Sequence, residues 1–408
     1  MELKPGYKQT DVGVIPQGWE ASTLKQAAEI SAGINKSISE MGSGALYVTV
    51  QDLYDGTSIR TQRLGRIKVS PPEIQAKALV VGDIVFGKSS VKREGIGFPS
   101  QFSGADEPVV FSGFTYRARA RQGTADAVFL FYALRWNKTR KWLIDNSQAS
   151  ALTNINQSIA DAIPIPLPPL PEQRVIAEAL GDVDAMLGAL GKLIAKKRDL
   201  KQAAMQQLLT GQTRLPGFSG VWEVKRFGEI ASPRTERIDP RRGHLQDFCV
   251  ELEHIGQGSG QLVGSGAMDE HSSLKSVFRA GDVLFGKLRA YLRKYWLADR
   301  DGVCSTEIWA LVAQRQMVTP KFLFRVVQVE GFLEAATTAY GTHMPRSDWN
   351  VVENYEVALP CVDEQTAIAT VLSDMDAEIA ALEQRLAKTR ALKQGMMQEL
   401  LTGRTRLV

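Results

Sequence analysis

Cysteine and histidine are scarce in this chain, which has three cysteines and four histidines among 408 residues. Cys249, Cys304 and Cys361 form no Cys-x-x-Cys pair, and no histidine stands at zinc-ligand spacing from them. A disulfide framework and a zinc site are therefore not expected, and the cysteines are predicted to be free thiols. We expect neither a metal ion nor another cofactor.

Recognisable catalytic motifs are absent as well. The sequence has no His-Glu-x-x-His stretch, no glycine-rich S-adenosylmethionine loop and no convincing acidic cluster ahead of Glu-x-Lys. Ser70–Glu73, which reads Ser-Pro-Pro-Glu, comes nearest to a methyl-transfer motif but ends in the wrong residue. With only four histidines, the chain has few side chains from which an acid–base or metal centre could be built. We expect a protein that is not itself an enzyme.

Long hydrophobic runs are missing too. No apolar run approaches the ~18 residues of a membrane span, and the N-terminal stretch lacks the apolar core of a signal peptide. We therefore expect a cytoplasmic protein without membrane contact. Hydrophobic residues make up 44% and charged residues 23%, and the length favours two or three domains with conventional cores. The net charge of +4 permits an anionic partner without requiring one.

A tandem duplication dominates the sequence. Pro168–Leu215 recurs without a gap as Pro360–Leu407, and about half of the positions are identical. A weaker echo pairs Gly82–Lys88 with Gly281–Lys287. Because internal repeats define the architecture of a chain, we predict two halves, each a globular segment followed by a long helix.

Apolar residues recur at alternating spacings of four and three in both repeated segments. A period near 3.5 is typical of helices that pack lengthwise against one another. The simplest partner for each helix is its own duplicate, packed antiparallel, and the alternative is that each helix folds back on its own domain. The predicted helix-pairing residues are Ile176, Leu180, Val183, Leu187, Leu190, Ile194, Ile368, Leu372, Met375, Ile379, Leu382 and Leu386.

The ends of both helices carry matching signals. Pro171 or Asp363 stands just before a Glu-Gln pair, as a tolerated proline or a capping acid with further acid in the first turn. Gly211 or Gly403 follows Leu-Leu-Thr, where a left-handed glycine commonly ends a helix. Each helix is expected to run about 40 residues, or roughly 60 Å.

The globular segments mix short β-type runs with glycine-rich turns. Strands are expected at 46–50, 78–81, 83–86, 109–111 and 283–285, late helices at 126–144 and 319–336, and loops at 146–156 and 337–350. We predict an α+β fold with two mixed α/β domains, separated by two long antiparallel helices that form a coiled coil with pseudo-two-fold symmetry. The predicted ranges are 1–165 and 216–358 for the domains, and 166–215 and 359–408 for the helices.

Gly82–Ser89 matches the phosphate-binding pattern Gly-x-x-x-x-Gly-Lys-Ser letter for letter. Such a loop needs small residues that wrap a phosphate, followed by a helix. Here the four intervening residues are strand-like, a turn follows Ser89, and the second copy has Leu288 in place of the hydroxyl. We therefore predict a strand ending in a basic turn, rather than a nucleotide site.

Basic and polar side chains follow this turn in both halves and recur before each long helix. Lysine, arginine, serine and tyrosine at loop tips contact phosphates and guanine edges, and asparagine pairs with adenine. The alternatives are solvated basic loops and asparagines that only form turns, and the arginines of 234–242 are as compatible with surface charge as with phosphate contact. The DNA-binding candidates are Lys88, Ser89, Ser90, Lys92, Arg93, Asn154, Asn156, Lys287, Arg289, Tyr291, Arg293, His343 and Arg346.

The whole chain resembles the specificity subunits of type I restriction–modification systems. The resemblance rests on Pro-Leu-Pro-Pro-Leu-Pro-Glu-Gln-Arg-Val-Ile-Ala at 166–177, on Leu-Leu-Thr-Gly-x-Thr-Arg-Leu at both helix ends, and on the segments Val12–Glu20 and Arg214–Glu223. Pro-Cys-Val-Asp at 360–363 departs from the usual proline-rich lead-in, so a different cap is expected there.

The resemblance implies a DNA-reading subunit without catalysis. Two target recognition domains would each read one half of a split, asymmetric site in double-stranded DNA. The paired helices would hold them apart and bind two methyltransferase (modification) subunits, which restriction (translocase and nuclease) subunits join in the larger assembly. Exchanging residues 1–150 should then change one half-site only. The rival hypotheses are an ATPase or self-contained restriction–methylation enzyme, and a coiled-coil assembly scaffold.

Overall fold

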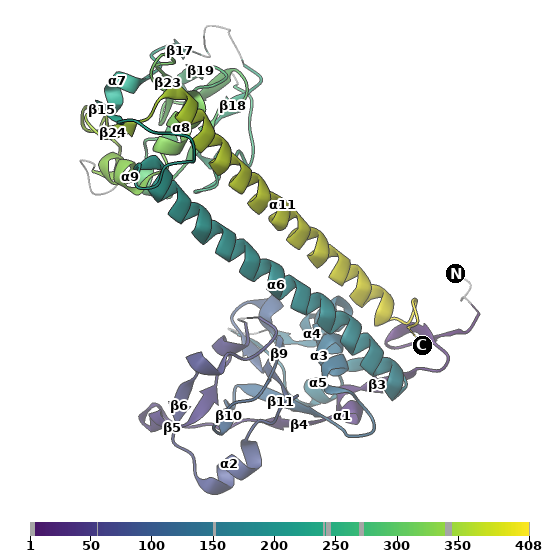
Figure 1. Cartoon of the computed structure of the whole chain (residues 1–408). Coiled ribbons are helices and arrows are strands. Elements are labelled where there is room, and N and C mark those ends of the chain that lie inside the picture. Colours follow the sequence, from purple (N-terminus) through teal and green to yellow (C-terminus); the bar gives the residue numbers. More distant parts are fainter. Residues whose placement is uncertain are drawn as a thin grey trace. The chain divides into compact units, whose positions relative to one another are not determined.

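The computed structural model describes residues 5–54, 56–149, 152–239, 241, 246–268, 273–338 and 345–407. The chain forms two compact units: unit 1 comprises Met1–Leu190 with Arg385–Val408, and unit 2 comprises Gly191–Gln384. Both units are mixed α+β structures, and each contains part of two long helices, α6 (Leu170–Leu209) and α11 (Val362–Leu400) (Figure 1).

The two long helices have the expected length, with 40 residues in α6 and 39 in α11. The expected stop signals are also confirmed. Gly211 and Gly403 have φ angles of +71° and +65°, a left-handed conformation that glycine adopts without a steric penalty. No helix in the described part of the chain combines the length and apolar character that crossing a membrane requires.

Unit 1 is built on an antiparallel sheet of order β4-β11-β7-β9 and a three-stranded sheet, β10-β5-β6, whose β10-β5 pair is parallel. Smaller ladders have the orders β12-β13-β8, β14-β3 and β1-β2. The strands are β1 (Tyr7–Thr10), β2 (Gly13–Pro16), β3 (Glu20–Thr23), β4 (Ala28–Ala32), β5 (Met41–Val48), β6 (Gly65–Ile67), β7 (Ile84–Gly87), β8 (Ser89–Ser90), β9 (Pro99–Gln101), β10 (Val109–Phe111), β11 (Thr115–Ala120), β12 (Gln148–Ala149), β13 (Thr153–Asn154) and β14 (Pro164–Leu167). The shorter helices are α1 (Leu24–Ala27), α2 (Pro71–Lys77), α3 (Ala127–Arg135), α4 (Asn137–Asn146) and α5 (Gln157–Asp161).

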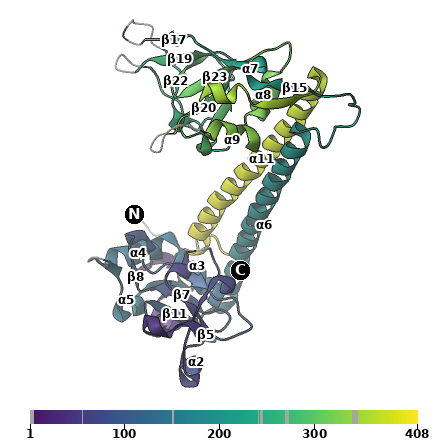
Figure 2. The ribbon, with the colours of Figure 1, turned by 90° about the vertical axis from the view of Figure 1, so that its left-hand side faces the viewer.

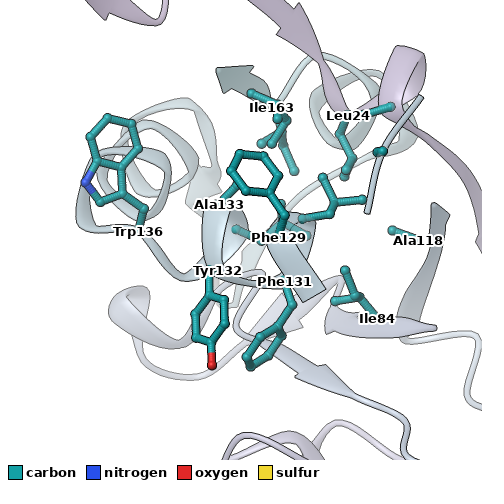
Figure 3. Packing of buried hydrophobic residues seen from close by; sticks show 14 of the residues in the cluster. Leu24, Ile84, Ala118, Phe129, Phe131, Tyr132, Ala133, Trp136 and Ile163 are labelled. Atoms are coloured by element: carbon teal, nitrogen blue, oxygen red, sulfur yellow. The ribbon is translucent and has the colours of Figure 1, made fainter. Parts of the chain in front are cut away.

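The core of unit 1 forms around α3. Figure 3 shows Phe129 of this helix near Leu24 and Ile163, while Phe131 and Tyr132 extend from the helix away from those two residues; all five are buried. The start of α6 and the end of α11 add apolar residues to the same cluster. Each fully buried side chain of this size contributes about 1.5–3 kcal/mol, so the long helices and the globular part of unit 1 stabilise one another.

Unit 2 repeats this plan, with an antiparallel sheet β16-β23-β20-β21 and a second sheet β17-β19-β22-β18 that also contains one parallel pair (Figure 2). As β14 pairs with β3 in unit 1, β24 pairs with β15 here. The strands are β15 (Glu223–Arg226), β16 (Ala231–Pro233), β17 (Arg237–Ile238), β18 (Cys249–Val250), β19 (Lys275–Phe278), β20 (Val283–Gly286), β21 (Tyr295–Leu297), β22 (Gly302–Ser305), β23 (Ile308–Ala313) and β24 (Glu356–Leu359). The shorter helices are α7 (Phe227–Ile230), α8 (Pro320–Val326), α9 (Glu330–Thr337) and α10 (Trp349–Val352).

Several expected elements differ from the structure. Residues 78–81 form no strand, and β12 and β13 lie in the expected loop 146–156. The helix expected at 126–144 is broken at Trp136, whose backbone is extended (ψ 136°) and whose side chain is buried. The helix expected at 319–336 is likewise two helices, because Val329 has an extended backbone before α9. The apolar pattern continues across both breaks, so it could not reveal them.

Candidate nucleic-acid interface

The Gly-Asp-strand-Gly-Lys motif of unit 1 is built around a buried aspartate. Asp83 accepts a hydrogen bond from the backbone of Val80 (2.8 Å) and two from the guanidinium of Arg119 (2.8 and 2.7 Å). This pairing raises the pKa of Arg119. Strand β7 follows, and the short strand β8 begins directly after Lys88. The motif is therefore a strand ending in a turn, as the sequence predicted.

The copy in unit 2 has the same construction. Asp282 accepts from the backbone of Arg279 (2.8 Å) and from the guanidinium of Arg234 (2.9 and 3.0 Å). The arginine comes from the end of β16, whereas Arg119 of unit 1 lies on β11. The partly buried Arg234 is thus engaged in an ion pair with Asp282. Neither a solvated surface charge nor a phosphate contact, the two alternatives for this arginine, describes that role.

Backbone hydrogen bonds hold each turn lysine between two loops. In unit 1 the Lys88 N–H donates to Phe114 (2.8 Å), and the Lys88 carbonyl accepts from Ile155 (2.9 Å). In unit 2 the Lys287 N–H donates to the Glu307 carbonyl (3.0 Å), and the Lys287 carbonyl accepts from the Ser347 N–H (2.8 Å). We call this shared arrangement the lysine frame. It makes Phe114 equivalent to Glu307 and, one residue before the second loop contact, Asn154 equivalent to Arg346.

A pocket of about 1300 Å³, here the Lys88 pocket, opens over the lysine frame of unit 1. Five of the thirteen predicted residues line it, namely Lys88, Ser89, Ser90, Lys92 and Asn154. The Lys88 ammonium lies 4.9 Å from the centre of the Tyr116 ring, and neither it nor Lys92 forms an ion pair with a carboxylate in the described part of the chain. Exposed apolar side chains complete the lining: Met41, Tyr54, Val91, Phe114 and Leu152.

A smaller pocket of about 370 Å³, here the Lys287 pocket, lies at the same place in unit 2. It is lined by Lys287, Trp309, Arg346, Ser347, Asp348 and Trp349. Two tryptophan rings meet edge to face there, 5.4 Å apart. Glu307 accepts two hydrogen bonds of 2.9 Å from Arg346, which raise the pKa of that arginine. The two pockets therefore share a backbone frame and differ in side chains.

Other predicted residues have structural roles or lie away from the pockets. Asn156 caps α5 by accepting from the Ile159 N–H (2.9 Å), so its side-chain oxygen is already used. The Ser90 hydroxyl donates to the Lys92 carbonyl (2.6 Å). Arg93 is exposed outside the lining of the Lys88 pocket. His343 lies outside the described residues.

The basic loop after Lys287 has an unusual backbone. Arg289 and Arg293 have φ angles of +54° and +52°, a region that non-glycine residues seldom occupy. Arg293 donates to both carboxylate oxygens of Glu330 (2.8 and 2.7 Å), and Tyr291 between them is about half exposed. None of the three lines the Lys287 pocket. Strained conformations of this kind persist where surrounding contacts fix them, often at functional sites.

The Glu-Gln pair at the start of α6 does more than begin a helix. The buried Glu172 accepts from the indole of Trp19 (2.9 Å) and from the guanidinium of Arg406. Gln173 accepts from the backbone of Asp126 (2.8 Å) and donates to Thr124 (3.0 Å), which fixes the loop before α3. We call this the glutamate clasp, because it ties the globular part of unit 1 to the start of α6 and to the segment that follows α11.

Unit 2 contains the same clasp with the residues of the other copy. Glu364 accepts from Trp222 (3.1 Å) and from Arg214 (2.5 and 2.6 Å). Gln365 accepts from the backbone of Thr319 (2.9 Å) and donates to Met317 (2.7 Å). The repeated Trp-Glu, Glu-Gln and Thr-Arg-Leu stretches are thus the three parts of one contact, which sequence spacing alone could not show.

One further aspartate on each helix joins the helices to the globular parts. In unit 1 Asp184 accepts from the Tyr132 hydroxyl (2.7 Å) and pairs with Lys393 (2.6 Å). Burial and this hydrogen bond raise the pKa of Tyr132, so the phenol keeps its proton. In unit 2 Asp376 pairs with Arg325 (2.6 Å) and Lys201 (2.5 Å). In unit 2 Lys197 also pairs with Glu378 (2.6 Å), so the ion pairs run in opposite sequence order along α6 and α11, and the paired segments of this unit are antiparallel.

The predicted helix-pairing residues divide into two groups. The first residues of each seam enter the cores of the globular parts: Ile176 and Leu180 in unit 1, and Ile368, Leu372 and Met375 in unit 2. The alternative that a helix folds back on its own domain therefore applies to these turns. Further along, Leu190, Ile194 and Ile379 are buried, whereas Val183, Leu187, Leu382 and Leu386 are partly exposed.

All three cysteines are free, and burial raises the pKa of Cys249 to about 11, so this thiol stays protonated. Within the described ranges no group of three His, Cys, Asp or Glu side chains could hold a metal ion.

Comparison with known proteins relates this architecture to one family. Residues 16–197 match the type I restriction modification DNA specificity domain. The chain is 24% identical over 323 residues to the type I restriction enzyme MjaVIII specificity subunit of Methanocaldococcus jannaschii, covering 73% of this chain and 75% of that protein. It is 24% identical over 307 residues to the EcoDI specificity subunit of Escherichia coli, covering 67% and 68%.

A solved structure shares the fold. The S subunit of a type I restriction–modification system from M. genitalium superimposes with a TM-score of 0.59 at 13% identity, covering 98% of both chains. Residues 16–197 thus carry the type I restriction modification DNA specificity domain, and over about two thirds or more of its length the chain is similar to specificity subunits of type I restriction–modification systems.

Proposed function

We propose that the chain reads an asymmetric site in double-stranded DNA in two parts, one through the Lys88 pocket and one through the Lys287 pocket. The observation that carries this proposal is the lysine frame. An identical set of backbone hydrogen bonds presents Asn154 and Phe114 in unit 1, but Arg346 and Glu307 in unit 2. Sequence is read by side chains at base edges, so the same frame with different side chains suits two readers with different targets.

A binding selection tests the proposal. The full-length chain, assembled with type I methyltransferase subunits, is incubated with duplexes that carry a randomised stretch of about three helical turns. We expect enrichment of two unlike tracts separated by a fixed number of unspecified base pairs. Enrichment of a single continuous tract, or of no sequence, would contradict two-part reading.

Lys88 and Lys92 are proposed to contact phosphates, because both residues line the Lys88 pocket and neither forms an ion pair with a carboxylate among the described residues. Replacing each with alanine should weaken binding to all sequences alike and lower the slope of log affinity against log salt by about 1 per lysine. Filter binding over a salt series measures this. Lys141→Ala, which removes an exposed lysine away from the pocket, is the matched control; equal slopes for all variants would exclude the contact.

We further propose that residues 1–165 and 216–358 are the two target recognition domains, and that 166–215 and 359–408 form a coiled-coil spacer with pseudo-two-fold symmetry. The duplicated clasps and the antiparallel ion pairs of unit 2 support this arrangement. The chain itself would then carry recognition, while methyltransferase and restriction subunits carry the chemistry.

The repeat also supports two equivalent binding sites for methyltransferase subunits. Leu200 and Leu392 occupy the same position of the two copies and are 48% and 60% exposed. Identical exposed glutamines follow at Gln202 and Gln394. A single exposed leucine is ordinary, but a repeated apolar and amide surface on two helices fits a partner that binds twice.

Leu200→Glu and Leu392→Glu should therefore each remove one of two bound methyltransferase subunits, and the double variant should bind neither, because a charge would be buried at the contact. Native mass spectrometry of the assembly gives the count. Met186→Glu is the matched control, since Met186 is 46% exposed and the other copy already has Glu378 there. If the double variant still binds two methyltransferase subunits, their binding sites do not include Leu200 and Leu392.

A further inference from the structure

One turn of the lysine frame has the same construction in both units. Its carbonyl group accepts the hydrogen bond from the backbone N–H of Lys88 or Lys287. In unit 1 the Ser112 hydroxyl accepts from the Phe114 N–H (3.2 Å); in unit 2 the Ser305 hydroxyl accepts from the Glu307 N–H (3.3 Å). The backbone of Phe114 and of Glu307 is therefore held at two points, because its N–H donates to the serine and its carbonyl accepts from the lysine N–H. The side chain at that position differs completely, being a phenyl ring in unit 1 and a carboxylate in unit 2.

In unit 2 this carboxylate controls the direction of Arg346. Glu307 accepts from Nε and Nη2 of the guanidinium, at 2.9 Å each. Arginine has five donors in a rigid planar fork, so Nη1 and the second proton of Nη2 form a second, adjacent edge. That edge has no hydrogen-bond partner among the described residues. Arg346 is 54% exposed, Glu307 only 25%, and the arginine lines the Lys287 pocket.

Such an edge suits guanine. Guanine presents two acceptors, O6 and N7, in the major groove, and arginine binds both at once. A guanidinium held by a carboxylate has already lost most of its rotamer freedom, so less entropy is lost when the base is bound. A free arginine in the same loop could contact any phosphate, whereas the fork restricts Arg346 to one direction.

In unit 1 the equivalent side chain is apolar. Phe114 is 64% exposed and lines the Lys88 pocket. An exposed ring on a fixed turn is costly in water and suits an apolar contact. In the major groove the thymine methyl group is the apolar feature of the base pairs, and phenylalanine is among the side chains that contact it.

We infer that this turn position decides specificity in each unit: Glu307 is a positioning residue that holds Arg346 for guanine, and Phe114 contacts a thymine methyl group. The inference rests on the proposed two-part reading and names the bases that the site selects. Asn154 and Lys88, which the sequence singled out, would then act beside a residue that no motif in the sequence marked.

The test compares base preferences rather than affinity alone. Full-length Arg346→Ala, Arg346→Lys, Glu307→Ala and the double Ala variant are put through the randomised-duplex selection. Arg346→Ala should lower the preference for guanine at one position of one tract by roughly 10- to 100-fold. Arg346→Lys should lose the preference but keep overall affinity, because lysine retains the charge without the fork. Glu307→Ala should lower the preference, and the double variant should be no worse than Arg346→Ala, since the two residues act as one unit.

Phe114→Ala should reduce preference for thymine at one position of the other tract by about fourfold, the value of one buried methyl group. Arg66 and Glu107 provide the control for Glu307→Ala, because they form another exposed two-bond fork (2.7 and 2.6 Å) away from both pockets. Glu107→Ala should change neither tract.

Two results would overturn the inference. One is an unchanged guanine preference in Glu307→Ala and Arg346→Ala. The other is a loss of affinity for all sequences alike, which a merely structural role would produce. In both cases the wild-type chain should still enrich two unlike tracts, and the proposed function would then remain supported. If the wild-type chain enriches no sequence, the proposed function itself is contradicted.

Discussion

Glu172→Ala is expected to lower the free energy of unfolding of unit 1 by about 3 kcal/mol, the largest stability effect of any single substitution considered. Breaking a buried charge pair usually costs about 3–5 kcal/mol. The lower figure applies because Arg406, at 38% exposure, can regain water, whereas the indole N–H of Trp19 cannot. Urea unfolding followed by tryptophan fluorescence measures the change.

Glu178→Ala is the matched control for this loss. Glu178 lies on the same helix and is exposed, so its replacement should stay within about 0.5 kcal/mol of the wild type. Glu364→Ala should affect unit 2 as Glu172→Ala affects unit 1. If Glu172→Ala unfolds at the same urea concentration as Glu178→Ala, the clasp contributes nothing to stability.

Exchanging the first reader for that of another family member is expected to change one half-site completely and leave the other intact. Binding to the original site should fall by about a thousandfold or more, since specific binding exceeds non-specific binding by at least that factor. Mapping of methylated adenines in cells carrying the chimera with its methyltransferase measures both half-sites at once. A change in both half-sites would show that the readers are not independent.

The structure improves the boundary of that exchange. A junction at residue 150, which the sequence suggested, would separate Asn154 and Ile155 from the Lys88 turn they contact. Strand β14 pairs with β3 at the start of the reader and ends at Leu167. An exchange of residues 1–167 therefore keeps the lysine frame and its sheet together, and should give the better-folded chimera.

The long helices were predictable because their signals are local. The seam recurs every three or four residues, and Gly211 and Gly403 stand directly after the last turn. The clasps were not predictable, because Glu172 and Arg406 are 234 residues apart. The Glu-Gln pair was interpreted as a helix start, which is correct but incomplete.

The turns at Lys88 and Lys287 were predicted from a short sequence repeat. Of the two loops that contact each lysine, only some residues were predicted. Lys88, Asn154 and Arg346 were identified, whereas Phe114 and Glu307 were missed because the segments before them share only a valine and a serine. The spacing Ser112-x-Phe114 and Ser305-x-Glu307 was the available signal, but a serine three residues before a strand is too common to notice alone. Asn156 was included because α5 (Gln157–Asp161), which this residue caps, was not predicted.

The aspartates Asp184 and Asp376 accept different partners, a neutral phenol from Tyr132 and a cationic guanidinium from Arg325. The same position of the two helices therefore accepts either kind of donor. We expect a globular part that offers a phenol or a guanidinium at this point to fit either helix without a change in the aspartate.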